Sequence, residues 1–201
     1  MWRLWKDVST GIVDVGIALG ADSVTLSPVA GKPIPQFEYE DEGILGVAMP
    51  SVFALATRRL METQGVTIQD FAQVSVKAHA AGALNPAAQC CPRTTIEQVV
   101  NSRMIADPTT VLQCCPSTDC AAAIILCSGS CARRYTTKLI HIVASVAPAG
   151  DGLVEGKSLI SIGVGHQAAR HAYEVAGLGP YDLDVVEIHD GFACEEILHY
   201  E

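Results

Sequence analysis

Residues 163–201 read GVGHQAARHAYEVAGLGPYDLDVVEIHDGFACEEILHYE, and the order of elements in this stretch decides the fold class. Small and apolar residues at helical spacing predict a helix from about Gly165 to Ala176, with Gly177 as its C-cap. The apolar run Leu183–His189 then predicts a buried strand. This strand would deliver a His-Asp pair into a turn at Gly191, a common place for catalytic groups.

A second apolar run, Leu139–Val146, precedes this helix and predicts another strand. Strand, helix and strand at this spacing form a βαβ unit, whose two strands run parallel. Two further buried strands are expected at Gly11–Gly20 and Asp119–Ser128. Together these elements predict an α/β fold.

The middle of the chain is predicted to be helical after a long irregular excursion over residues 21–50, which carries four prolines. Thr67 is expected to cap one of the helices, with Asp70 three residues later completing a capping box. The expected helices share apolar residues at helical spacing and lie at Ser51–Thr63, from Thr67 to before Asn85-Pro86, at Ile96–Val100, and at Ala193–Tyr200.

The composition excludes several classes of function. The chain has 201 residues, of which 49% are hydrophobic and 17% charged, with a formal net charge of −9. This profile is typical of a tightly layered α/β protein. Because the chain is acidic and has no cluster of Lys and Arg, neither nucleic acid nor an anionic membrane surface is an expected partner. No apolar run is long enough to span a membrane.

The cysteines and histidines give no metal-binding pattern. None of the eight cysteines forms a Cys-x-x-Cys pair, and the histidines lack metal-like spacing with carboxylates, so no metal site is expected. The N-terminal segment lacks the apolar core of a signal peptide. We therefore expect a cytoplasmic chain whose cysteines are thiols, most of them small buried side chains.

Three segments resemble the thiolase superfamily, specifically its sterol-carrier-protein-type branch of thiolases and thiolase-like lipid-transfer proteins. Asp14–Thr25 (DVGIALGADSVT) is similar to a family strand, and Met104–Leu126 is close to a branch pattern that ends L-x-C-C-P-x-S-D-G-A-A-A-x-x-L. Gly163–Tyr200 follows the branch's run of helix, strand, H-D-C-F and E-L-x-x-Y-E. Lys77–Gln89 (KAHAAGALNPAAQ) fits the helical insert, where relatives read K-N-H-x-x-x-x-x-N-P-x-A-Q.

The resemblance implies a layered αβαβα fold of two similar halves with a loop domain between them. It covers nearly the whole chain but only about half of a typical member. Residues 1–26 would end the N-terminal half, and residues 27–110 would form the loop and helical insert. Residues 111–135 would give the last strand of the N-terminal half and a linker, and residues 136–201 the start of the C-terminal half.

The resemblance also implies acyl-CoA chemistry. In the family a thiolate takes the acyl group, a His activates the thiolate, oxyanion holes stabilise the negative charge that develops, and a second cysteine or its equivalent moves the proton. The nucleophilic cysteine turn and the G-H-P motif find no match here. Gly191 stands at the third position of H-D-C-F, where relatives often carry the second cysteine.

His189 is the main candidate catalytic residue. By resemblance its imidazole helps to hold a water or the thioester oxygen in an oxyanion hole, with a purely structural role as the alternative. Asp190 would orient the turn or the imidazole, or serve as a solvated or capping residue. Gly191 and Ser117 are assigned to substrate binding by the same resemblance. Cys194, at the start of the last helix, is either a reactive thiol or a packed one.

The expected function is that of a thiolase-like acyl-CoA acyltransferase, inactive as this chain alone. The CoA thioester is the substrate, and no cofactor is expected. One alternative is a retro-aldolase subunit that acts on a hydroxyacyl-CoA with an OB-fold partner, since such a reaction needs no thiolate. The other is a non-catalytic CoA-binding or dimerising subunit. The expected assembly is a homodimer or a hetero-oligomer.

Overall fold

A computed structural model describes residues 1–25, 48–89, 92–148 and 163–200. The chain divides into two compact units, each described here by itself. Of the described residues, the first unit holds 1–23, 119–148 and 163–186, and the second holds 24–25, 48–89, 92–118 and 187–200. Most of the irregular excursion predicted for residues 21–50 lies outside the described residues.

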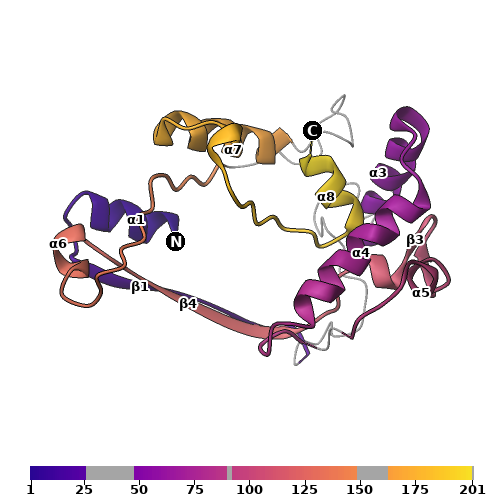
Figure 1. The fold of residues 1–201 in the computed structure, drawn as a ribbon, viewed down its shortest axis with the longest axis horizontal. Helices are drawn as coiled ribbons and strands as arrows, with labels where there is room; N and C mark the ends of the chain where they lie inside the picture. Colours follow the sequence, from indigo (N-terminus) through magenta and orange to yellow (C-terminus); the bar gives the residue numbers. More distant parts are fainter. Residues whose placement is uncertain (26–47, 90–91, 149–162, 201) are drawn as a thin grey trace. The chain divides into compact units, whose positions relative to one another are not determined.

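The first unit is built on an antiparallel pair of strands, β1 (Val15–Ser23) and β4 (Asp119–Cys127). The register pairs Val15 with Cys127 at one end and Ser23 with Asp119 at the other, and the two strands lie side by side in Figure 1. The other elements of this unit are helices: α1 (Trp2–Ser9), α6 (Gly129–Ala132), α7 (Gly163–Ala176) and a 3-10 helix at Pro180–Asp182.

Both predicted strands form, but the prediction that they are buried is wrong. Side chains such as Ile17, Leu19 and Ile125 are more than 60% exposed, because a two-stranded sheet has little to cover it. Helix α1 packs close to β1 at Gly16, where an added Cβ would lie 2.3 Å from the Leu4 side chain. Gly16 thus allows the helix to approach the strand.

The strands predicted at Leu139–Val146 and Leu183–His189 are absent, so the predicted βαβ unit is wrong for the described residues. Their apolar sequences suit strands, and Ile140 and Val185 are 89% and 85% exposed. A strand needs a neighbour to take its backbone hydrogen bonds, and these segments pair with none of the described strands. Between them, α7 and the positive φ of its C-cap, Gly177, are as predicted.

The second unit gathers helices from distant parts of the sequence. Its helices are α3 (Met49–Gln64), α4 (Ile68–Gly82), α5 (Ile96–Val100) and α8 (Ala193–His199), joined by the short hairpin of β2 (Met104–Ala106) and β3 (Thr109–Thr110) and a 3-10 helix at Val111–Gln113. All four predicted helices are confirmed. The predicted capping box is confirmed too, since the Asp70 N–H donates to the Thr67 hydroxyl and the Asp70 carboxylate accepts from the Thr67 N–H.

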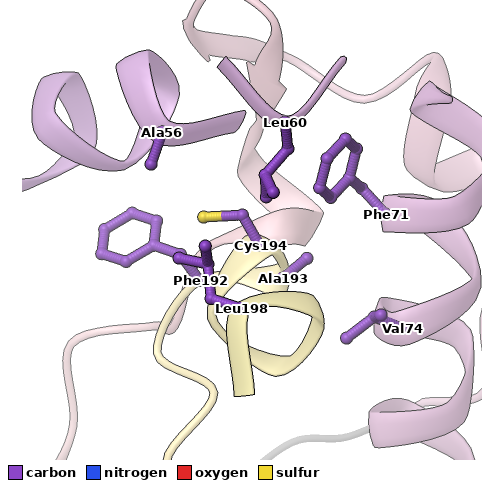
Figure 2. Close-up of a cluster of buried hydrophobic side chains, with 8 residues drawn as sticks. All are labelled: Ala56, Leu60, Phe71, Val74, Phe192, Ala193, Cys194 and Leu198. Atoms are coloured by element: carbon purple, nitrogen blue, oxygen red, sulfur yellow. The ribbon is translucent and has the colours of Figure 1, made fainter. Parts of the chain in front are cut away.

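Helices α3, α4 and α8 meet in one apolar cluster (Figure 2). Helix α3 contributes Ala56 and Leu60, and α4 contributes Phe71 and Val74, so the helical spacing seen in the sequence does mark the core face. The remaining members lie in and just before α8: Phe192, Ala193, Cys194 and Leu198. The Phe192 ring also stacks on Phe53 of α3, with centroids 4.3 Å apart. This cluster therefore attaches the start of α8 to α3 and α4. Within the described ranges, no helix is both long and apolar enough to cross a membrane.

Leu60→Ala should destabilise the protein by about 2–5 kcal/mol, because it opens a cavity in this cluster. Leu60 is fully buried, whereas Leu55 on the same helix is 54% exposed. The matched variant Leu55→Ala should therefore change the free energy of unfolding by less than about 0.5 kcal/mol. Urea unfolding of both variants measures the difference, and equal losses would contradict the described packing.

Candidate functional site

The His189–Gly191 turn lies beside a second segment that the sequence analysis singled out. Phe192 forms an antiparallel bridge with Cys114, and the Cys115 N–H donates to the Gly191 carbonyl at 2.8 Å. The side chains of Cys114 and Phe192 both pack against the apolar cluster. The fold thus brings together two sequence motifs that are more than 70 residues apart.

The backbone after His189 is held from two directions. The Phe192 ring stacks on Phe53, and the Phe192 N–H donates to the Glu195 carboxylate at 2.9 Å. The second contact caps the first turn of α8. Because both contacts fix Phe192, the residues immediately before it are attached to a buried anchor.

Gly191 is buried beneath two polar side chains. A Cβ added at this residue would lie 2.9 Å from His189 Nε2 and 3.1 Å from Glu195 Oε2. Any larger residue at position 191 would have to displace the imidazole, the carboxylate or both. The two distances also bring Nε2 and Oε2 within about 6 Å of each other.

The environment of Glu195 changes its acidity. Burial raises the pKa of the Glu195 carboxyl above its usual value, and this effect exceeds the lowering by the Phe192 N–H and by the charges of His189 and His199. The negative charge of Asp190 raises the same pKa further. Four titratable side chains therefore interact around one turn.

The structure places the predicted site residues unequally. His189 is exposed and Asp190 is half-buried, and both stand next to Gly191. Ser117 is exposed and lies two residues beyond Cys115, on the segment that runs beside this turn. Glu195 was missed by the sequence analysis. Its place three residues after Phe192, the capping-box position, was the available signal.

A buried ion pair fixes the other end of α8. Lys77 of α4 and the Tyr200 hydroxyl both donate to Glu196 Oε1, and the Glu196 side chain is only 3% exposed. Burial by itself lowers the pKa of Lys77, but the hydrogen bond and charge of Glu196 outweigh this effect and raise it. The pair joins two of the motif segments, since Lys77 begins one and Glu196 lies in the other.

A pocket of about 410 Å³ lies elsewhere, in the first unit, between α1, the end of β4 and residues 139–142. None of its lining residues belongs to the His189 turn, so we do not assign it to the chemistry of that turn. The described residues also contain no group of three or more His, Cys, Asp or Glu side chains that could hold a metal ion.

Comparison with known proteins gives the family. No protein-family profile matches the chain. However, it is 38% identical over 197 residues to an acetyl-CoA acetyltransferase of Methanothermobacter thermautotrophicus, a match that covers 96% of the chain and 51% of the relative. It is 32% identical to the benzoylsuccinyl-CoA thiolase subunit BbsB of Thauera aromatica (98% and 51% covered), and 36% identical to human sterol carrier protein 2 (96% and 38% covered).

The chain belongs to the thiolase superfamily. Its similarity to sterol carrier protein 2 places it with the sterol-carrier-protein-type, acyltransferase-related members of that superfamily. The chain spans about half the length of the first curated relatives that it matches.

Solved structures show the thiolase-like α/β fold. The Ltp2-ChsH2(DUF35) aldolase matches 95% of the chain with a TM-score of 0.78 at 23% identity, and 52% of its own chain is covered. A monomeric SCP2-thiolase-like protein of Mycobacterium smegmatis matches with a TM-score of 0.64 at 15% identity, covering 99% of this chain and 45% of that one. The dimeric peroxisomal thiolase of Saccharomyces cerevisiae matches with a TM-score of 0.61 at 19% identity, covering 98% and 55%. The predicted fold class is confirmed.

Within this thiolase-like fold, Cys194 packs into the apolar cluster. Its side chain is 2% exposed in the chain, and its thiol donates to the Phe53 carbonyl at 3.6 Å. Burial raises the pKa of Cys194 to about 11. These observations favour the packed thiol over the reactive one. The six cysteines of the described residues are all free thiols.

Native-state alkylation with iodoacetamide at pH 8 should modify Cys115 and Cys120, which are exposed, well before Cys194. A thiol with a pKa near 11 is only about 0.1% thiolate at that pH, and the thiolate is the nucleophile. Peptide mapping by mass spectrometry gives the order of modification. Equal rates for Cys194 and Cys115 would restore the reactive-thiol interpretation.

Lys77→Met should destabilise the protein by about 1–3 kcal/mol, because the Glu196 carboxylate would stay buried without its cation. We expect the double variant Lys77→Met/Glu196→Leu to recover most of this loss, since it removes the buried charge as well. Urea unfolding of both variants checks the pair. A single variant as stable as the wild type would show that Lys77 contributes little.

Proposed function

We propose that this chain takes part in thiolase-type chemistry on acyl-CoA thioesters, with His189 as a hydrogen-bond donor to the thioester oxygen. The observation that carries the proposal is the position of His189: an exposed imidazole on a turn whose following residues are anchored in the apolar cluster. A donor held in place before the reaction stabilises developing negative charge without reorganisation. The CoA thioester is the substrate, and the proposed step uses no cofactor.

Acyl transfer is the first candidate reaction, supported by the acetyltransferase and thiolase-subunit relatives. We propose that the 201-residue polypeptide does not carry it out alone. Gly191 offers no thiol at the turn, and Cys194 and Cys114 have pKa values raised by burial to about 11. The chain would work in a larger assembly, a homodimer or a complex with an OB-fold protein. A cytoplasmic location agrees with the free thiols of the described residues.

Carbon–carbon bond cleavage is the second candidate, favoured by two observations. The solved structure with a TM-score of 0.78 to this chain is titled an aldolase and pairs Ltp2 with ChsH2(DUF35). Retro-aldol cleavage of a hydroxyacyl-CoA also needs a base and an oxyanion donor but no acyl-accepting thiolate. A turn that carries His189, Asp190 and Glu195 without a cysteine supplies groups of that kind.

The purified chain should bind acetyl-CoA in isothermal titration calorimetry but should not cleave acetoacetyl-CoA in the spectrophotometric thiolysis assay. His189→Gln should weaken binding, and Glu187→Gln, a charge change on an exposed side chain two residues away, should leave it unchanged. Release of an aldehyde or ketone from a hydroxyacyl-CoA would favour the lyase candidate. Thiolysis by the chain alone would contradict the proposal, and absence of acetyl-CoA binding would overturn it.

A further inference from the structure

Glu195 and His189 converge on the empty side-chain position of Gly191. Their Oε2 and Nε2 atoms stand 3.1 and 2.9 Å from the point where a Cβ would be. The backbone below them is fixed by the Cys115 N–H and the Phe192 bridge. An acceptor of protons and a donor of hydrogen bonds therefore flank the same small space, within about 6 Å of each other.

We propose that Glu195 is a catalytic base, which removes a proton from the α-carbon of the acyl thioester while the His189 N–H binds the thioester oxygen. This inference rests on the proposed function and assigns the proton-transfer group of that site. The assignment follows from the geometry of the turn, since the hydrogen bond from the Phe192 N–H accounts only for the capping of α8.

The step balances without a co-reactant. The Glu195 carboxylate takes the α-proton, the electrons of the C–H bond form the enolate, and the negative charge develops on the thioester oxygen next to His189. The carboxylic acid then returns a proton to the same carbon. In heavy water the returned nucleus is a deuteron, so the cycle replaces α-hydrogen by deuterium in an otherwise unchanged thioester.

The surroundings of Glu195 suit this role. Burial raises the pKa of its carboxyl, which makes the carboxylate a stronger base, and Asp190 acts in the same direction. The charges of His189 and His199 and the Phe192 N–H oppose this effect. The neighbouring thiols are less suitable: Cys194 is buried in the apolar cluster, while Cys115 is exposed across the strand bridge and is the rival to be tested.

The test is exchange of the acetyl protons of acetyl-CoA in heavy water, followed by proton NMR with the full 201-residue chain. We expect exchange with the wild type, and about a 100-fold slower rate in Glu195→Gln, the scale of a general base. Glutamine keeps the side-chain oxygen that accepts from the Phe192 N–H, so α8 should stay capped. A thermal melt checks that the variant is folded. Slow exchange in a Glu195→Gln variant that melts as the wild type does identifies a role in chemistry.

Controls separate this inference from the proposed function. Cys115→Ala and Glu187→Gln should exchange at the wild-type rate, whereas His189→Gln should be slowed by about 100-fold. Calorimetry with acetyl-CoA runs in parallel. Binding without exchange, unchanged exchange in Glu195→Gln, or loss of exchange in Cys115→Ala would overturn the inference while leaving the proposed function in place. Failure of the wild type to bind acetyl-CoA would overturn both.

Discussion

The second unit depends on the packing of Phe192 against α3. Its ring stacks on Phe53 and belongs to the same cluster as Leu60 and Phe71, and its backbone pairs with Cys114. Apolar burial of this kind contributes roughly 25 cal/mol for each Å² removed from water, which makes aromatic residues the strongest anchors. Through Phe192 the cluster positions the polar turn before it. A buried contact thus supports exposed chemistry.

The two ends of α8 are held by different forces. At its start, the Glu195 carboxylate caps the Phe192 N–H, and at its end, the buried Glu196 carboxylate accepts from Lys77 and Tyr200. Adjacent glutamates therefore have separate roles: Glu196 faces a cation inside the unit, while Glu195 faces the polar turn. The second arrangement is less favourable for the ionised carboxylate, since burial raises its pKa. Strongly perturbed carboxylates at polar turns are a recurrent feature of functional sites.

The helices could be predicted from the sequence because their determinants are local. The Thr67–Asp70 capping box, Gly177 in the left-handed region and the apolar spacing of Ala56 and Leu60 all involve residues within a few turns of one another. Strands depend on partners that are distant in sequence. The runs at Leu139–Val146 and Leu183–His189 have the apolar character of strands, yet they find no ladder among the described residues, because hydrogen-bonded pairing is decided by what lies alongside.

The sequence by itself determined the family, the helices of the second unit and the identity of the His189–Gly191 turn, because motifs and local spacing carry that information. Tertiary structure alone decided that Glu195 stands above Gly191, that Cys194 is enclosed by the apolar cluster, and that Cys115 lies across from the turn. These relations join residues from separate elements, and only the packing of α3, α4 and α8 brings those elements together. The candidate base was therefore visible only after the chain was folded.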